Sequence, residues 1–440
     1  MNSTKNILSI SYPIILTLIA QNFINVTDTA FLGHVSEVAL GASAIAGVFY
    51  FAVYMVGFGF SQGVQILIGR RNGEKNYIQI GVIFNNGLIF NFILAILIFI
   101  ASEYGVPPLL KVLVSSDHVY EAALEFLHWR IFGFFFVFLS VIFRAFYVGI
   151  TDTKVLTISA VITAVVNIIL DYLLIFGKFG FPAWGIAGAA IASVIAEGVS
   201  LFYLIVHTLL FTDLNKYQLF KQFRVGVQTT IQILHLSVFI MFQFFISIST
   251  WFMFFIFIER MGERPLAVTN IGRSMYILLM IPASALSTTA STLVSNLIGA
   301  DFRHNVMQTV HKIIGIALVF VAPFLIFAWV FPQLFAHIYT DDPSLILAAV
   351  PVIKVVAVAV VFFAVGNVII NSVSGTGSTK VAFYIEVLTL FFYISFVYYT
   401  SMVNRQPVFV VWMSEFVYWT IIGGLGYLYL QKGNWQTKKI

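Results

Sequence analysis

Residues 155–177 read VLTISAVITAVVNIILDYLLIFG and carry a single charged side chain, Asp171. A helix of about 20 apolar residues crosses the hydrocarbon core of a bilayer, so this stretch is long enough to span a membrane. Its continuous apolar character favours a helix, because barrel strands alternate between lipid-facing and lumen-facing residues. The stretch therefore predicts a transmembrane helix that carries one carboxyl group.

Comparable apolar windows recur along the whole chain. Of the 440 residues, 60% are hydrophobic and only 9% are charged, whereas roughly a quarter of the residues in a soluble domain are charged. This composition excludes an ordinary soluble enzyme and predicts an all-α polytopic membrane protein. Hydropathy predicts twelve transmembrane helices, at residues 7–32, 42–68, 80–102, 119–147, 155–177, 184–211, 227–258, 266–298, 310–331, 345–372, 381–402 and 408–430. The first is longer than a signal-peptide core, so no cleaved leader is expected.

The lysines and arginines predict the orientation in the membrane. With both termini in the cytoplasm, fifteen of these residues fall on the cytoplasmic side and five on the outer side. This bias agrees with the positive-inside rule. The formal net charge of +5 thus reports topology, and no basic patch with interleaved aromatic residues points to nucleic acid. We expect a bacterial inner-membrane protein with both termini cytoplasmic.

Short motifs predict an internal repeat. Three sets of residues recur in the same order at offsets of 230, 226 and 222; they are Leu67-Ile68-Gly69 with Leu297-Ile298-Gly299, Thr153-Lys154-Val155 with Thr379-Lys380-Val381, and Gln21, Asn25 and Asp28 with Gln243, Ser247 and Thr250. Each repeat holds six spans, an even number, so the halves share one orientation. We expect two pseudo-symmetric six-helix lobes around a central cleft, residues 1–211 and 227–440, joined by a cytoplasmic linker at 212–226.

Polar side chains inside the first lobe predict an ion site. A carboxyl group in hydrocarbon costs about 3 kcal/mol, so it usually faces a cavity or a partner. Asp171 follows Asn167 by one turn, and the helical rise brings Asp28 and Ser193 to a similar depth. Two neighbouring carboxylates either share a proton or bind a hard cation such as sodium. The alternative is that both aspartates cap a helix or snorkel to an interface.

Further charged side chains lie within spans. They are Glu197, Glu386 and Glu415, together with Arg130, Arg273 and Lys354. Pairing among them is one explanation, and Glu197, one turn after Ser193, is also a candidate member of the ion site. We expect a substrate cavity lined by Gln21, Asn25, Gln243, Ser247 and Glu386. The roles of the three glutamates stay open at this stage.

The composition also bears on the substrate and on catalysis. Aromatic residues make up 17% of the chain, and aromatic rings near carboxylates favour bulky organic cations. The chain has no cysteine, no HExxH zinc motif and no GxSxG nucleophile elbow. We therefore expect neither an enzyme nor a cofactor beyond a coupling sodium ion or proton.

Several ordered motifs resemble those of the multidrug and toxic compound extrusion (MATE) family. They are Val26-Thr27-Asp28-Thr29-Ala30 with Gly33, Asn167-Ile168-Ile169-Leu170-Asp171, Gly188-Ala189-Ala190-Ile191-Ala192-Ser193, and the Gly69 and Gly299 helix ends. The resemblance covers nearly the whole chain. It implies a twelve-helix antiporter that exchanges sodium or protons for organic cations by rocker-switch alternating access. It also implies that Asp28, Asn167 and Asp171 form a cation site, with Ser193 where a threonine is usual.

The resemblance has departures and leaves alternatives. Some branches of the family bind sodium through a glutamate in the seventh helix and an aspartate in the tenth, and this sequence has neither. A flippase for lipid-linked oligosaccharides is the nearest alternative, although such proteins tend to have more helices and a cationic cavity. An ion channel or a lipid-modifying enzyme has no sequence feature behind it. We expect a monomer, and the sequence does not distinguish sodium from proton coupling.

Overall fold

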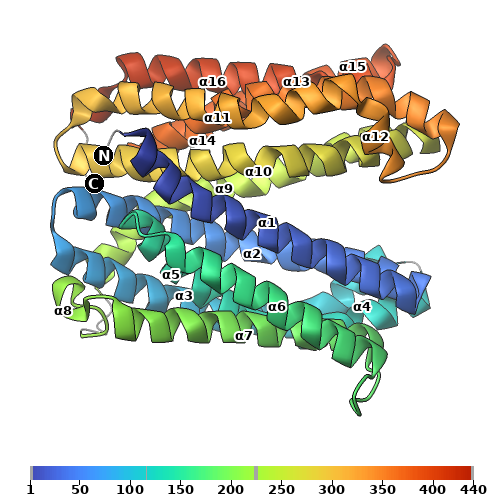
Figure 1. Ribbon diagram of the computed structural model, residues 1–440, viewed down its shortest axis with the longest axis horizontal. Helices are drawn as coiled ribbons and strands as arrows, with labels where there is room; N and C mark the ends of the chain where they lie inside the picture. Colours follow the sequence, from blue (N-terminus) through green and yellow to red (C-terminus); the bar gives the residue numbers. More distant parts are fainter. Residues whose placement is uncertain (1–2, 115, 222–225, 438–440) are drawn as a thin grey trace. The chain divides into compact units, whose positions relative to one another are not determined.

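The computed structural model describes residues 3–114, 116–221 and 226–437, and its regular elements are all helices. Within these residues eleven helices are long and apolar enough to cross a membrane, and one bent helix pair supplies a twelfth span. The prediction of an all-α membrane protein with twelve spans is therefore confirmed (Figure 1). Arg224, Lys438 and Lys439, which enter the orientation argument, and residues 222–225 of the expected linker lie outside the described residues.

The chain divides into two compact units. One unit, here called the N-unit, is Tyr12–Met241, and the other, the C-unit, joins Met1–Ser11 to Phe242–Ile440. The division falls within the helix Val227–Glu259, after the linker expected at 212–226. The boundaries of the two lobes therefore stay a prediction, and each unit is described by itself.

The N-unit contains the helix Thr4–Val35 from Tyr12 onward, six further long or medium helices and one short helix, together with the part of the helix Val227–Glu259 up to Met241. The helices before Val227 are α1 (Thr4–Val35), α2 (Glu37–Gly73), α3 (Tyr77–Leu113), α4 (Asp117–Arg130), α5 (Gly133–Gly149), α6 (Lys154–Phe176), α7 (Gly185–Phe211) and α8 (Leu214–Tyr217). Helix α2 packs against α3, α4 and α5, while α6 and α7 form a tight antiparallel pair. Helix α1 contacts α6 through a hydrogen bond from the Thr157 hydroxyl to the Pro13 carbonyl, 2.9 Å long.

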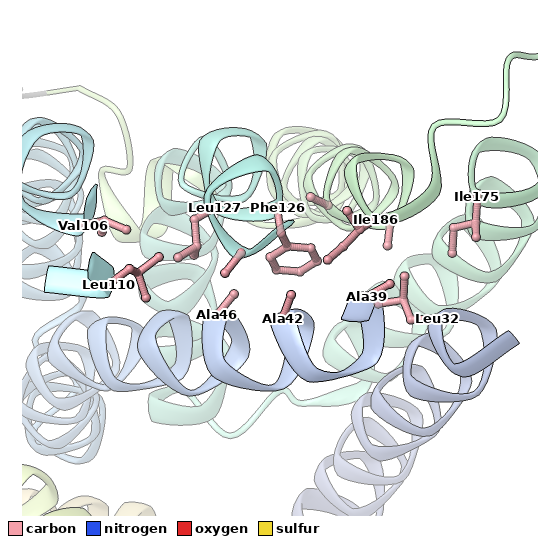
Figure 2. Packing of buried hydrophobic residues seen from close by; sticks show 13 residues of the cluster. Leu32, Ala39, Ala42, Ala46, Val106, Leu110, Phe126, Leu127, Ile175 and Ile186 are labelled. Carbon is pink, nitrogen blue, oxygen red and sulfur yellow. The ribbon is translucent and has the colours of Figure 1, made fainter. Parts of the chain in front are cut away.

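Thirteen buried apolar residues form a core at one end of the N-unit (Figure 2). The core joins the last turns of α1 and α6 to the first turns of α2 and α7, with α3 and α4 packed beside them. Leu32 on α1 and Ile175 on α6 belong to it and are 2% and 3% exposed. Because Leu32 follows Asp28 by four residues and Ile175 follows Asp171 by four, this core lies one helical turn from each of the two aspartates.

The span expected at 119–147 is broken. Helices α4 and α5 meet at an angle of 51°, and the N–H groups of Phe134 and Phe135 bond the carbonyls three residues earlier, at 3.1 and 3.3 Å. Such bonds belong to a tighter turn than the α-helix. Arg130 ends α4 and Gly133 begins α5, so the break places an arginine at the end of a helix inside the unit.

The C-unit also consists of long helices; it begins at Phe242, within the helix Val227–Glu259, and includes the start of α1. Its elements are α9 (Val227–Glu259), α10 (Glu263–Gly299), η1 (Arg303–Asn305), α11 (Val306–Val330), α12 (Pro332–His337), α13 (Pro343–Gly375), α14 (Thr379–Tyr398), the π-helix η2 (Tyr399–Val403), α15 (Val408–Trp412), α16 (Ser414–Lys432) and η3 (Asn434–Thr437). Helices α10 and α13 pack together most extensively, and α16 lies against α13 and α14. The arrangement brings α14 and α16 side by side.

Helix ends follow from capping residues. The Ser36 side chain accepts a hydrogen bond from the Ala39 N–H and starts α2, and Asp342 with Pro343 starts α13. Helix α2 continues to Gly73, four residues past the Gly69 end expected from the repeat. It stops there because Lys75 takes a left-handed conformation with φ of 58°, which a helix cannot continue.

Gly188 allows α6 and α7 to pack closely against each other. A Cβ atom on Gly188 of α7 would lie 2.6 Å from the Leu174 carbonyl oxygen of α6. Gly188→Ala is expected to lower the free energy of unfolding by about 1–3 kcal/mol, because the backbones must separate. Gly198→Ala in the same helix is the control, since its Cβ would lie 3.6 Å from the Phe136 ring. Thermal unfolding in detergent measures both, and equal melting temperatures would contradict this packing argument.

Candidate functional site

Two carboxyl groups face each other inside the N-unit. Asp171 on α6 is 0% exposed, and the Asp28 carboxyl on α1 lies within side-chain hydrogen-bond reach of it. Neither Asp171 oxygen has a hydrogen-bond donor, and Oδ1 of Asp28 also lacks one. Ionised carboxylates only accept hydrogen bonds, so the two groups bond to each other only when one carries a proton.

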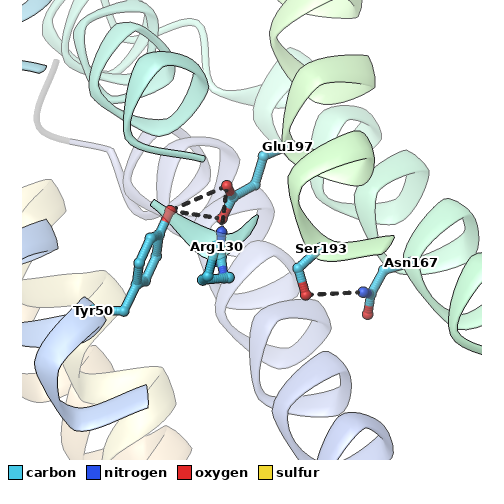
Figure 3. Close-up of polar contacts among 5 residues, drawn as sticks. All are labelled: Tyr50, Arg130, Asn167, Ser193 and Glu197. Atoms are coloured by element: carbon cyan, nitrogen blue, oxygen red, sulfur yellow. Dashed lines mark hydrogen bonds and ion pairs between the residues drawn. The ribbon is translucent and has the colours of Figure 1, made fainter. Parts of the chain in front are cut away.

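Asn167 lies on α6 one turn before Asp171, and Ser193 lies opposite it on α7. The Asn167 amide nitrogen donates to the Ser193 hydroxyl at 3.4 Å, which links α6 to α7 (Figure 3). The Asn167 amide oxygen is buried and has no donor. Because Asn167 precedes Asp171 by one turn, its side chain projects from the same face of α6. The four side chains expected at the ion site thus form two contacting pairs, Asp28 with Asp171 and Asn167 with Ser193, one turn apart along α6.

The chemistry of this cluster suits a small hard cation or a proton. Within this cluster, the buried atoms that lack a hydrogen-bond partner are all oxygens, and they belong to Asp28, Asn167 and Asp171. Buried polar atoms without a partner are costly, while sodium-like hard cations prefer oxygen ligands. The side chains present therefore fit the ion that the sequence predicts. Full burial of Asp171 does not fit the alternative in which it snorkels to an interface.

Glu197 is held in an ion pair beside this cluster. Arg130 donates to both carboxylate oxygens of Glu197, at 2.6 and 2.9 Å, and the Tyr50 hydroxyl donates at 3.2 Å (Figure 3). The guanidinium carbon lies 3.6 Å from the centre of the Tyr50 ring. The pairing expected among intramembrane charges is thus present for Arg130 and Glu197. Sequence reasoning missed Tyr50, because nothing in a single apolar span distinguishes it from the other tyrosines.

A second buried carboxyl group collects donors in the C-unit. Glu386 on α14 is 1% exposed. The Ser247 hydroxyl donates to it at 2.6 Å and the Gln243 amide at 3.3 Å, both from α9, and the Tyr418 hydroxyl donates from α16. Three residues expected at the substrate cavity are therefore in direct contact. Tyr418 was not expected, because nothing in the sequence of the last span distinguishes it from the other tyrosines.

The remaining expected cavity residues belong to the other unit. Gln21 and Asn25 are exposed on α1, within the N-unit. Their assignment to the substrate cavity stays a prediction. A shallow hollow of about 270 Å³ at the first turns of α10 and α13 contains none of the expected residues; Glu263, Arg264 and Asp342 are among those that line it.

The other intramembrane charges are not paired with each other. Glu415 is 4% exposed and accepts from the Tyr276 hydroxyl at 2.7 Å and from the Trp419 ring nitrogen at 3.0 Å. Arg273 lies over the Phe255 ring and Lys354 over the Trp329 ring. The pairing explanation therefore does not apply to these residues. Within the described ranges, no three His, Asp or Glu side chains gather into a metal-binding group.

Comparison with known proteins identifies the family. A family model described as MatE matches two stretches of the chain, residues 13–173 and 237–399, as an internal repeat requires. A probable multidrug resistance protein NorM of Thermotoga maritima is 25% identical over 392 residues, which are 85% of this chain and 80% of that protein.

Solved structures share the fold. The outward-facing conformation of a multidrug resistance MATE family transporter of the MOP superfamily aligns with a TM-score of 0.90 and 17% identity, over 97% of this chain and 95% of that one. The eukaryotic MATE transporter AtDTX14 aligns with a TM-score of 0.87 and 20% identity, over 98% and 96% of the two chains.

Proposed function

Because the chain belongs to the MatE family, we propose that it exports organic, cationic and aromatic compounds across the bacterial inner membrane in exchange for sodium ions or protons. The names of its relatives, such as the multidrug resistance protein of Thermotoga maritima, support efflux of several compounds. The chain acts as a transporter rather than an enzyme, as a monomer, with both termini in the cytoplasm. It binds no nucleic acid and uses no cofactor other than the coupling ion.

The observation that carries the proposal is the facing pair Asp28 and Asp171. Their buried oxygens lack donors, and the Asn167 amide oxygen beside them also lacks one. A sodium ion would be held by these three side chains together with the Ser193 hydroxyl, whereas a proton would be shared by the two carboxyl groups. Either ion removes one negative charge from the interior of the N-unit, which changes the energy of the states that differ in access to the site.

The substrate side of the proposal rests on Glu386. Its carboxyl group is oriented by Gln243, Ser247 and Tyr418, and it has no basic partner among the described residues. A buried negative charge without a counter-ion attracts an organic cation strongly in a low dielectric. Aromatic side chains near it add cation–π attraction. Gln21 and Asn25, which the sequence also assigns to a substrate cavity, are exposed on α1 of the N-unit.

Transport then follows rocker-switch alternating access. An external ion that binds Asp28 and Asp171 shifts the population toward one state, and its release inside resets the protein. The exported compound must bind the two states with different affinity, because a ligand with equal affinity shifts no equilibrium. The flippase alternative is less favoured, because the candidate ion site is built around the two carboxyl groups of Asp28 and Asp171 and the named relatives are multidrug resistance proteins.

The test is transport of a cationic dye in proteoliposomes with the two gradients imposed separately. An inward sodium gradient at equal pH, or an inward proton gradient without sodium, is expected to drive dye movement against its own gradient. Vesicles without protein, and vesicles with an ionophore that collapses the gradient, are the controls. A rate of dye transport that is the same with and without each gradient would refute ion coupling. Gradient-independent movement of a fluorescent lipid-linked oligosaccharide would support the flippase instead.

A further inference from the structure

An arginine lies next to the proposed ion site without being part of it. Arg130 ends α4 at the break of the bent span, and its side chain is only 12% exposed. Its guanidinium donates two hydrogen bonds to Glu197 on α7 and stacks on the Tyr50 ring of α2. A paired and stacked arginine of this kind is firmly positioned.

The same guanidinium is within Coulombic reach of both aspartates. Its positive charge lies near enough to the Asp28 and Asp171 carboxyl groups to attract them, and the Glu197 carboxylate lies near enough to Asp28 to repel it. Glu197 also follows Ser193 by one turn of α7, so the ion pair adjoins the proposed ion site along that helix. The charged groups that face Arg130 are therefore Glu197, Asp28 and Asp171, with the Tyr50 hydroxyl as a neutral neighbour.

Gly133 makes room for the ion pair. A Cβ atom at this position would collide with the Arg130 guanidinium and with the Glu197 carboxylate, and would come within 2.7 Å of the Tyr50 hydroxyl. A glycine is thus required where α5 begins, directly against the two charged groups. The break in the bent span and the ion pair form one packed arrangement.

We propose that Glu197 holds Arg130 away from the Asp28–Asp171 pair, so that the transported ion rather than the guanidinium neutralises these carboxylates. Arg130 and Glu197 are then positioning residues that set how tightly the ion binds. The inference rests on the proposed function, in that Asp28 and Asp171 bind the coupling ion. It assigns a role to two charges that the transport scheme itself does not use.

The charge balance gives the two residues opposite effects. With both aspartates ionised, the three carboxylates and one guanidinium carry a net charge of −2. Neutralising Glu197 leaves Arg130 with Asp28 and Asp171 as its nearest anions, so the guanidinium competes with the ion. Neutralising Arg130 removes that competitor and leaves a net charge of −3, so the ion binds more tightly. A merely structural ion pair predicts the same loss from either change.

The experiment measures the concentration of external ion that gives half-maximal dye transport in proteoliposomes. Sodium is titrated at fixed pH, and protons are titrated without sodium, for Glu197→Gln, Arg130→Gln and the double variant. We expect the half-maximal concentration of the driving ion to rise about tenfold in Glu197→Gln and to fall about tenfold in Arg130→Gln, from charge interactions at an intermediate dielectric. The double variant is expected within about threefold of wild type.

Two further variants serve as controls for the loss of a buried arginine and for the loss of its charge. Arg144→Gln removes a guanidinium of α5 that lies over the Phe58 ring at 5.0 Å, and is expected to leave the half-maximal concentration unchanged. Arg130→Lys loses the bidentate geometry but keeps the positive charge, so its half-maximal ion concentration is expected to stay within about threefold of wild type. This variant also serves if Arg130→Gln fails to fold. Size-exclusion profiles in detergent establish that each variant is folded.

The outcomes distinguish failure of the positioning role of Arg130 and Glu197 from failure of the proposed ion-coupled transport. Shifts of Glu197→Gln and Arg130→Gln in the same direction would overturn the positioning role, provided that wild-type transport is ion-driven and Asp28→Asn abolishes it. If Arg130→Gln does not fold, a tenfold shift in Arg130→Lys, or no shift in Glu197→Gln, overturns that role. Ion-independent wild-type transport would overturn the proposed function, and this inference with it.

Discussion

Asp171→Asn is expected to abolish ion-driven export while the protein still inserts and folds. The Asp171 carboxyl is fully buried, faces Asp28 and has no donor on either oxygen. An asparagine amide has nearly the same shape and donates a hydrogen bond, so it would bond permanently to the Asp28 carboxylate. The site would then behave as if its ion never left, and the cycle of binding and release would stop.

Asp28→Asn is expected to have the same effect, since the pair acts as one unit. The matched control is Asp152→Asn, which changes an exposed carboxylate in the connection between α5 and α6 and is expected to transport at the wild-type rate. Dye export is followed in proteoliposomes under each gradient, with thermal unfolding in detergent as the check on folding. Wild-type export by both Asp28→Asn and Asp171→Asn would exclude them as the coupling groups.

Glu386→Gln is expected to weaken transport of monovalent organic cations strongly. A glutamine oxygen can still accept from the Ser247 and Tyr418 hydroxyls, and the Gln243 amide can turn so that its oxygen accepts from the new NH2 group. The helices α9, α14 and α16 therefore remain packed. The change removes the negative charge alone. Since the charge acts in a low dielectric, we expect the half-saturating concentration of a cationic dye to rise by about tenfold to a hundredfold.

The control for this second prediction is another buried carboxyl group of the same unit. Glu415→Gln also replaces a carboxylate bonded to neutral donors, Tyr276 and Trp419, but it lies outside the expected cavity, so cation affinity is expected to stay near wild type. An uncharged aromatic dye is measured beside the cationic one. The assignment of Glu386 fails if Glu386→Gln weakens both dyes equally, or if Glu415→Gln reproduces its effect.

Local features of the sequence were sufficient for much of the fold and part of the site. Span lengths depend on the apolar content of a single window, so twelve spans were predictable. The four-residue spacing of Asn167 and Asp171, and of Gln243 and Ser247, fixed which side chains share a helical face. Hydropathy did not detect the break between Arg130 and Gly133, because it averages the apolar content of a whole window and carries no information on the angle between helices.

The sequence by itself determined which charged and polar side chains lie within the membrane, since burying each one requires a partner or a cavity. Only the tertiary structure decided which side chains are the partners of these groups. Asp28 meets Asp171, Arg130 meets Glu197, and Glu386 meets Tyr418 across helices that are distant in the chain. Such pairings depend on how the helices pack against one another, and no spacing within a single helix encodes that.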